Sequence, residues 1–159
     1  MNRYEQLTVK AAAYSIAFNT NRERCQMLAK TVALELQAFL GSPTGAIRFA
    51  PLDINLKSDL RTEAITTLPS MTYKNDGRWH VGIRIHLPNS KYNHLLQITL
   101  KFSIKLVNNR FILYSCEKEY EINSDDLETL KPVFSAIYEE LCEDYSKSPD
   151  KPTTMIGLR

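Results

Sequence analysis

Cysteine is scarce in this chain, and its distribution argues against two common ways of stabilising a small protein. Cys25, Cys116 and Cys142 are odd in number and widely spaced among the 159 residues. A disulfide framework or a zinc site would require paired or closely spaced cysteines. We therefore expect buried or half-buried thiols in a reducing cytoplasm. The core should form by ordinary apolar packing, since the chain is long enough to bury one.

Long apolar runs are also missing. No segment approaches the roughly 20 consecutive apolar residues of a membrane-spanning helix. The first 19 residues lack the basic and then apolar segments of a signal peptide. These absences predict a cytoplasmic protein that does not enter a membrane. We expect one domain over residues 1–145 and a flexible tail over residues 146–159.

Catalytic and cofactor motifs are absent as well. The sequence contains no Gly-x-Ser-x-Gly, Cys-x-x-Cys, His-Glu-x-x-His or dinucleotide-binding pattern. His80 and His86 fall on one face of one predicted strand, but six residues separate them by about 20 Å, too far to share a metal ion. The sequence therefore implies no cofactor, no metal site and no evident small-molecule substrate.

Two segments in the middle of the chain alternate apolar and polar residues. In the first segment the apolar positions are Trp79, Val81, Ile83, Ile85 and Leu87. In the second segment they are Leu96, Ile98, Leu100, Phe102, Ile104 and Leu106. Successive side chains of a strand point to opposite faces. Each segment is therefore predicted to be a strand with one apolar face and one polar, largely cationic face.

Turn residues predict how these strands connect. Gly77 can adopt the left-handed conformation of a short hairpin loop, which places Tyr73 beside Trp79 on the apolar face. Asn108-Asn109 can form a two-residue turn with both residues at positive φ, which pairs Val107 with Arg110. The result is a predicted antiparallel meander of four or five strands.

The two ends of the chain have the spacing of helices. Four apolar residues near the N-terminus recur at helical intervals: Leu7, Ala11, Tyr14 and Phe18. Asn19-Thr20-Asn21 interrupts this pattern, and Thr20 with Glu23 matches a capping box. We predict two N-terminal helices, over residues 4–18 and from about residue 20 to residue 40, the second ending at Gly41. A C-terminal helix should start near Asn123 and kink or restart at Pro132.

Together these patterns predict an α+β fold. It has two N-terminal helices, an antiparallel meander of four or five strands, and a C-terminal helix packed on the sheet, because the apolar sheet face must meet another layer. The predicted core residues are Trp79, Ile83, Ile85, Ile98, Leu100, Phe102, Ile104, Phe134 and Ile137.

Charge is distributed unevenly along the chain. Residues 1–116 hold 15 Lys or Arg and 7 Asp or Glu, a net charge of +8, whereas residues 117–159 hold 5 and 11, a net charge of −6. The polar sheet face collects a predicted cationic site: Lys74, Arg78, His80, Arg84, Lys101, Lys105 and Tyr114, with Lys91 and Tyr92 nearby. Such a face fits an acidic protein surface or, as an alternative, nucleic acid, whose phosphates pair with Lys and Arg.

The predicted second helix is apolar on two sides, which is typical of a helix packed between layers or against another subunit. Its second side consists of Met27, Thr31, Leu34 and Ala38, which we treat as a candidate interface. The favoured hypothesis is a small non-catalytic accessory protein that acts through protein–protein contacts, including self-association, within a larger assembly.

A metal-dependent nuclease is the second alternative. Asp53, Asp59 and Glu63 are the one acidic cluster in the cationic part of the chain, and three carboxylates can hold a divalent cation for phosphodiester cleavage. The acid-x-Lys pair that would support this chemistry is missing at the expected spacing. Enzymatic activity is therefore the less favoured hypothesis.

Overall fold

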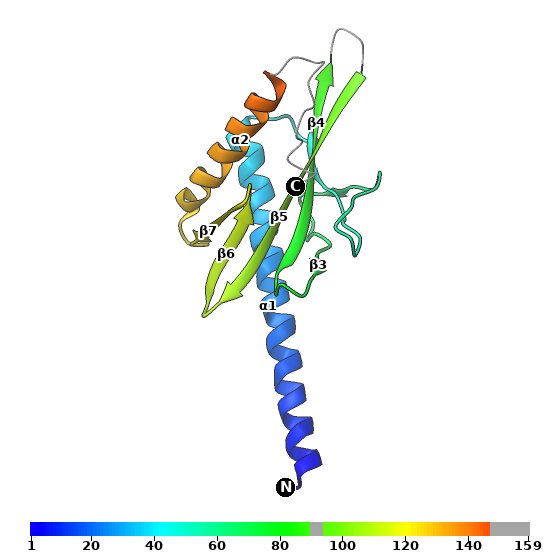
Figure 1. The fold of residues 1–159 in the computed structure, drawn as a ribbon, viewed down its shortest axis with the longest axis vertical. Coiled ribbons are helices and arrows are strands. Elements are labelled where there is room, and N and C mark those ends of the chain that lie inside the picture. Colours follow the sequence, from blue (N-terminus) through cyan, green and yellow to red (C-terminus); the bar gives the residue numbers. More distant parts are fainter. Residues whose placement is uncertain (90–93, 147–159) are drawn as a thin grey trace.

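The chain forms one long helix, an antiparallel sheet and a short helical segment at the C-terminal end. The computed structural model describes residues 1–89 and 94–146, so Lys91, Tyr92 and all but the first residue of the predicted tail lie outside it. In chain order the elements are α1 (Arg3–Leu40), β1 (Ile47–Phe49), β2 (Glu63–Ala64), β3 (Thr72–Tyr73), β4 (Trp79–Asn89), β5 (His94–Val107), β6 (Arg110–Ser115), β7 (Lys118–Ile122), the 3-10 helix η1 (Leu127–Leu130) and α2 (Lys131–Tyr145) (Figure 1). The predicted α+β class with an antiparallel sheet is confirmed.

The prediction of two N-terminal helices is wrong, because α1 is a single helix of 38 residues. It passes through Asn19-Thr20-Asn21 without a break, and its capping box is formed by Asn2 and Glu5 instead of Thr20 and Glu23. Asn and Thr each cost less than about 1 kcal/mol relative to Ala inside a helix. That cost is too small to break a helix whose following turns are packed against a sheet. The predicted end at Gly41 is confirmed, with Gly41 left-handed at φ 62°.

The sheet is larger than predicted and is only partly a meander. Within the described residues it has seven strands in the order β2-β1-β4-β5-β6-β7, and β3 pairs with β4 beside β1. From β4 to β7 consecutive strands are neighbours, as expected for a meander. A short edge strand expected within residues 47–52 forms as β1, but it lies between β2 and β4 instead of at the edge. The additional strands are β2, and β7, which follows a turn at Cys116-Glu117.

Both predicted hairpins are confirmed in register. Tyr73 pairs with Trp79, and Gly77 has φ 74° at the intervening turn. Val107 pairs with Arg110 across a turn in which Asn108 and Asn109 have φ 50° and 61°. Local turn chemistry therefore set the pairing of these strands, and the alternation of apolar residues agrees with it.

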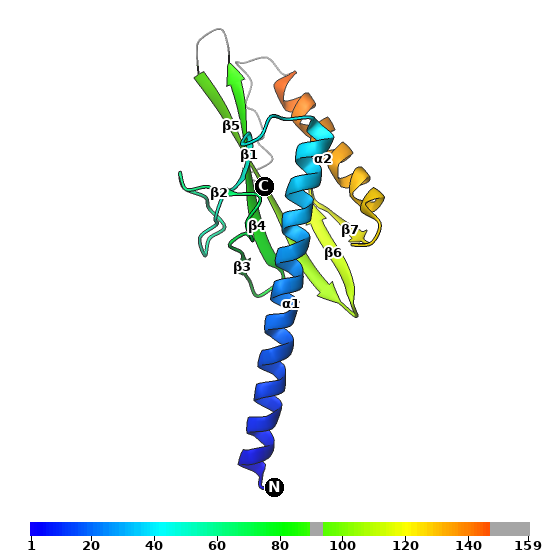
Figure 2. The ribbon, with the colours of Figure 1, turned by 180° about the vertical axis from the view of Figure 1, so that it is seen from behind.

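One face of the sheet is covered by both helices. In α1 the buried side chains recur every three or four residues: Cys25, Leu28, Ala29, Val32, Ala33 and Leu36. They share one core with Val133, Phe134 and Ile137 of α2 and with the apolar sheet face, so the nine predicted core residues are all buried. Figure 2 shows α1 crossing this face, and Figure 1 shows the opposite face free of helices.

The C-terminal helix restarts at Pro132, as predicted. Asp126 caps η1 by accepting a hydrogen bond from the backbone N–H of Glu128, and α2 then begins with Pro132 in its first turn, where the missing N–H does no harm. Asp144, in the last turn of this helix, is buried. Cys142 is exposed, which corrects the expectation for that thiol, whereas Cys25 is fully buried.

The length of α1 is not sufficient for it to span a membrane. Among the described residues, none of the helices is both long and apolar enough to cross a bilayer, although α1 has 38 residues.

Replacing Phe102 with Ala should lower the free energy of unfolding by about 3–5 kcal/mol, because its ring lies in the core with 7% of its surface exposed. The matched control is Leu7→Ala on the exposed half of α1, which should change this free energy by less than about 0.5 kcal/mol. Urea unfolding followed by circular dichroism measures both. Equal losses in the two variants would contradict the assignment of faces.

Burial raises the pKa of the Cys25 thiol to about 11, with Arg24 lowering it in part. The thiol should therefore stay protonated and unreactive at pH 8, since the thiolate is the nucleophile. Titration of the native protein with a thiol-reactive disulfide reagent should modify Cys142 rapidly and leave Cys25 untouched until denaturant is added. Rapid modification of Cys25 in the native state, located by peptide mass spectrometry, would contradict the packing of α1 on the sheet.

Candidate functional site

The polar sheet face brings the predicted cationic residues together. β4 contributes His80 and Arg84, β5 contributes Lys101 and Lys105, and β6 contributes Tyr114. The pairing of His80 with Ser103, and of Ser103 with Tyr114, aligns these strands across the face. The strand register therefore explains why residues far apart in the sequence share one surface.

Arg78 crosses this face instead of pointing into solvent. Its guanidinium lies 4.7 Å from the ring centroid of Tyr114 on β6, and Nη2 forms an ion pair with Oε1 of Glu119 on β7. Its Nη1 atom is buried and has no hydrogen-bond partner among the described residues. Stacking and ion pairing hold the side chain in this position, so much of its charge is neutralised within the protein.

His80 is also engaged within the protein. Its Nε2 atom lies 2.9 Å from Oδ2 of Asp76 in the preceding turn. Burial alone would raise the pKa of Asp76, but the backbone N–H of Arg78 and the His80 ring outweigh it and hold the pKa below its usual value. Asp76 is therefore an anchored carboxylate beside the imidazole.

A segment between β1 and β2 covers part of the polar face. We name residues 52–58 the cover segment; Leu52 and Ser58 form a bridge at its ends. Lys74 Nζ donates to the carbonyl oxygen of Ile54, and Arg84 Nη2 donates to Ser58 Oγ at 3.0 Å. Arg84 is thereby buried, with 5% of its surface exposed. The cover segment therefore shields part of this face from solvent.

Glycine makes this close covering possible. A Cβ atom on Gly82 would overlap the carbonyl oxygen of Ala50 and lie 2.9 Å from Cδ2 of Leu52. Only a residue without a side chain lets the chain after β1 approach β4 so closely.

Lys101 and Lys105 differ from the other cations of the face. Neither ammonium group has an ion-pair or hydrogen-bond partner within residues 1–89 and 94–146. Beside Lys101, under the edge of the cover segment, is a cavity of about 310 Å³. It is lined by Asn55, Leu56, His80, Lys101, Phe102, Ser103 and Tyr114. We name it the face cavity.

Ser103, His80 and Asp76 have the residue types of a nucleophile triad, but they do not form one. Oγ of Ser103 is buried and has no hydrogen-bond partner among the described residues, so it does not bond to the imidazole. An activated serine requires that bond to its base. These three side chains therefore do not form the hydrogen-bonded series of an activated serine.

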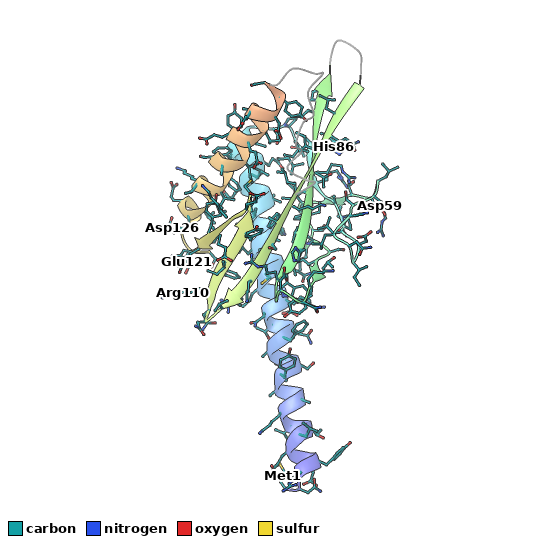
Figure 3. The ribbon with its side chains drawn as sticks, viewed as in Figure 1. Met1, Asp59, His86, Arg110, Glu121 and Asp126 are labelled. Atoms are coloured by element: carbon teal, nitrogen blue, oxygen red, sulfur yellow. The ribbon has the colours of Figure 1, made fainter. Side chains whose placement is uncertain are left out.

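The polar face also carries acidic residues that were not predicted from the sequence. Glu119 and Glu121 are paired with Tyr114 and Ile112, and Glu121 lies 3.7 Å from Arg110. The alternating residues 118–122 could have indicated a strand. The turn before them contains neither Gly nor Asn, so no hairpin was predicted there. The polar face is thus cationic on β4 and β5 and acidic at the β7 edge, where Figure 3 labels Glu121 and Arg110.

The three carboxylates of the nuclease hypothesis have separate structural roles. Asp53 accepts hydrogen bonds from the backbone N–H groups of Asn55 and Lys57, at 2.8 and 2.9 Å. The backbone N–H and side chain of Arg61 lower the pKa of Asp59, and Glu63 accepts from Ser70. In the described part of the chain no three His, Cys, Asp or Glu residues converge on a possible metal position. Figure 3 shows Asp59 on an outer loop.

The candidate interface on α1 faces away from the sheet. Met27 and Leu34 are exposed, and Met27 and Thr31 border a groove of about 400 Å³ between α1 and β6. Phe111 forms the β6 wall of this groove, with the guanidinium of Arg24 5.4 Å from its ring centroid. The groove has both apolar and charged walls.

The first half of α1 projects beyond the sheet. Every residue from 1 to 17 is exposed, and Figures 1 and 2 show this part of the helix extending away from the rest of the chain to Met1, labelled in Figure 3. At 100° per residue, Tyr4, Leu7 and Tyr14 continue the stripe that is buried in the second half. Val9 and Ile16 continue the opposite stripe, which contains Met27 and Leu34. Both stripes are apolar and exposed in the projecting half.

Comparison of the chain with protein-family models, curated protein sequences and solved structures gives no match. Its function is therefore inferred from the surfaces described above.

Replacing Gly82 with Ala should force the chain after β1 away from β4 and lower the free energy of unfolding by about 1–3 kcal/mol. Trypsin should also cut faster after Lys57 and Arg61, which are exposed next to the displaced backbone. Urea unfolding and timed proteolysis measure the two effects. Thr66→Ala, at an exposed position between β2 and β3, is the control and should leave both unchanged. Wild-type behaviour of the Gly82 variant would show that the two segments do not meet there.

Proposed function

We propose that this chain is a non-catalytic accessory protein that acts through protein–protein contacts made by α1. The observation behind this proposal is the projecting half of the helix, in which Tyr4, Leu7, Tyr14 and Ile16 are each at least 65% exposed. Single exposed apolar residues are ordinary on a protein surface, but aligned ones on an unsupported helix are typical of an interface. Partner helices commonly contact residues spaced three and four apart.

The geometry offers two separate contact faces. The front stripe consists of Tyr4, Leu7, Ala11 and Tyr14, which follow the a and d spacing of a heptad. The back stripe consists of Val9, Ile16, Met27, Thr31, Leu34 and Ala38, and so includes the interface predicted from the sequence. Since the two stripes lie on nearly opposite sides of α1, a partner helix can contact one without the other.

Site-specific photo-crosslinking in the native host tests the proposal. A photoreactive amino acid is placed at Leu7 or Tyr14 in the front stripe, or at Met27 or Leu34 in the back stripe. Thr8 and Asn19, which lie on the side of α1 between the stripes, are the matched controls. We expect a discrete adduct from at least one stripe and none from the controls, because a specific interface presents only one side of the helix.

Introducing charge into the contacting stripe should then remove the adduct. Leu7→Glu with Tyr14→Glu, or Met27→Glu with Leu34→Glu, adds two negative charges, as does the control Thr8→Glu with Asn19→Glu. Sedimentation velocity on the purified protein distinguishes a second copy from a different partner. Adducts that are absent at all four stripe positions, together with a monomer at high micromolar concentration, would overturn the proposal.

A further inference from the structure

The face cavity has features of a binding site that the helix surface does not explain. It is bounded by β4, β5 and β6 and by the cover segment, and its volume of about 310 Å³ is at the lower end for small-molecule sites. A single water occupies about 30 Å³ of liquid, so the space is much larger than one bridging water requires. The volume suits a small organic molecule.

The polar groups around this cavity are mainly donors. The groups able to donate are the ammonium of Lys101, the hydroxyl of Ser103 and the amide of Asn55, whereas the Nε2 atom of His80 is already occupied by Asp76. None of the lining residues is acidic. The carboxylates beside these residues are occupied: Asp53 by the backbone N–H groups of Asn55 and Lys57, Asp76 by His80, and Glu119 by Arg78. The cavity therefore combines an unneutralised positive charge with several hydrogen-bond donors.

Ser103 supplies the most direct indication of a ligand. It is 1% exposed, and its Oγ atom has no hydrogen-bond partner within the described residues. Leaving a buried hydroxyl unpaired costs about 1–3 kcal/mol. Ser103 lines the cavity, so a ligand oxygen that displaces the side chains covering its hydroxyl would accept from it and remove that cost.

We infer that the face cavity binds a small organic phosphate, with the phosphate near Lys101 and Ser103 and the organic part against Tyr114 and Leu56. A phosphate has several acceptor oxygens and up to two negative charges, which match the donors better than a single carboxylate does. Arg78 stacks on Tyr114 and fixes the ring as one wall. The cover segment restricts access for a polymer backbone, so the cavity favours a small molecule over an extended nucleic acid.

Titration of the full chain with AMP, ribose 5-phosphate and inorganic phosphate tests this inference, with adenosine and ribose as uncharged counterparts. Nuclear magnetic resonance locates the binding, and calorimetry measures its affinity. We expect the organic phosphates to shift the backbone amide signals of Lys101, Ser103 and Tyr114, and to bind more tightly than inorganic phosphate. The uncharged compounds should cause no shift.

Two lysines of one strand provide a matched pair of variants. Lys101→Gln should weaken binding about tenfold or more, because it removes a charged donor. Lys105→Gln removes the same charge on the same face, but Lys105 does not line the cavity, so its effect should be less than about twofold. Ser103→Ala should weaken binding roughly fivefold. Thermal unfolding of each variant verifies that it is folded.

Three results would overturn the inference. The first is that no phosphate probe shifts these amide signals at 10 mM, a concentration that would detect dissociation constants up to about 10 mM. The second is an equal loss of affinity in the Lys101 and Lys105 variants, which would indicate only diffuse attraction to the face. The third is binding of an oligonucleotide without binding of AMP, which would assign the face to nucleic acid.

Discussion

Packing of one stripe of α1 on the apolar face of the sheet is the contact on which the rest of this structure depends. Apolar and polar side chains alternate along β4 and β5, so the apolar face must be covered, and Cys25, Leu28 and Val32 of α1 cover it at heptad spacing. α2 extends the same layer through Phe134, whose ring centroid lies 5.6 Å from that of Phe39. With the helices confined to one face, the other face is left for polar side chains and the cover segment.

This arrangement also explains why the two candidate surfaces are independent. Figures 1 and 2 show α1 on one side of the sheet and extending beyond its edge. The face cavity is lined by residues of the polar face, on the other side. The core between them includes Val81, Ile83 and Leu113, all nearly inaccessible to solvent. A charge placed on α1 is therefore separated from the cavity by a packed layer. Changes at the two surfaces should act additively, as distant sites do.

The parts of the fold that the sequence predicted are those set by local signals. Strand faces followed from alternation, and two hairpins followed from Gly77 and from Asn108-Asn109, which accept positive φ at little cost. β7 was missed because its turn uses Cys116 and Glu117, with φ 51° and 63°, residues that give no turn signal. The predicted helix break was wrong because the weak local preferences at Asn19 to Asn21 yielded to the packing of the following turns on the sheet.

The candidate site was less predictable, since it depends on contacts between distant segments. The residues of the cationic face were predicted to share one surface, but nothing in the sequence indicates that Arg78 reaches Glu119 or that Arg84 donates to Ser58. The cover segment has no periodic pattern, and its path depends on Gly82, a residue in another strand. The sequence therefore indicated which residues share a face but could not indicate which of them are neutralised there.

The projecting half of α1 is understandable as an extension of the packed half. Starting a helix in water is the unfavourable step, whereas adding residues to an existing helix is close to neutral. The turns that are fixed on the sheet provide that start, and the capping box of Asn2 and Glu5 satisfies backbone donors at the other end. These two devices keep the helix formed, but they do not remove Tyr4, Leu7 or Tyr14 from water. The chain therefore maintains an ordered apolar surface that its own core does not use, and this is the physical basis for expecting a partner there.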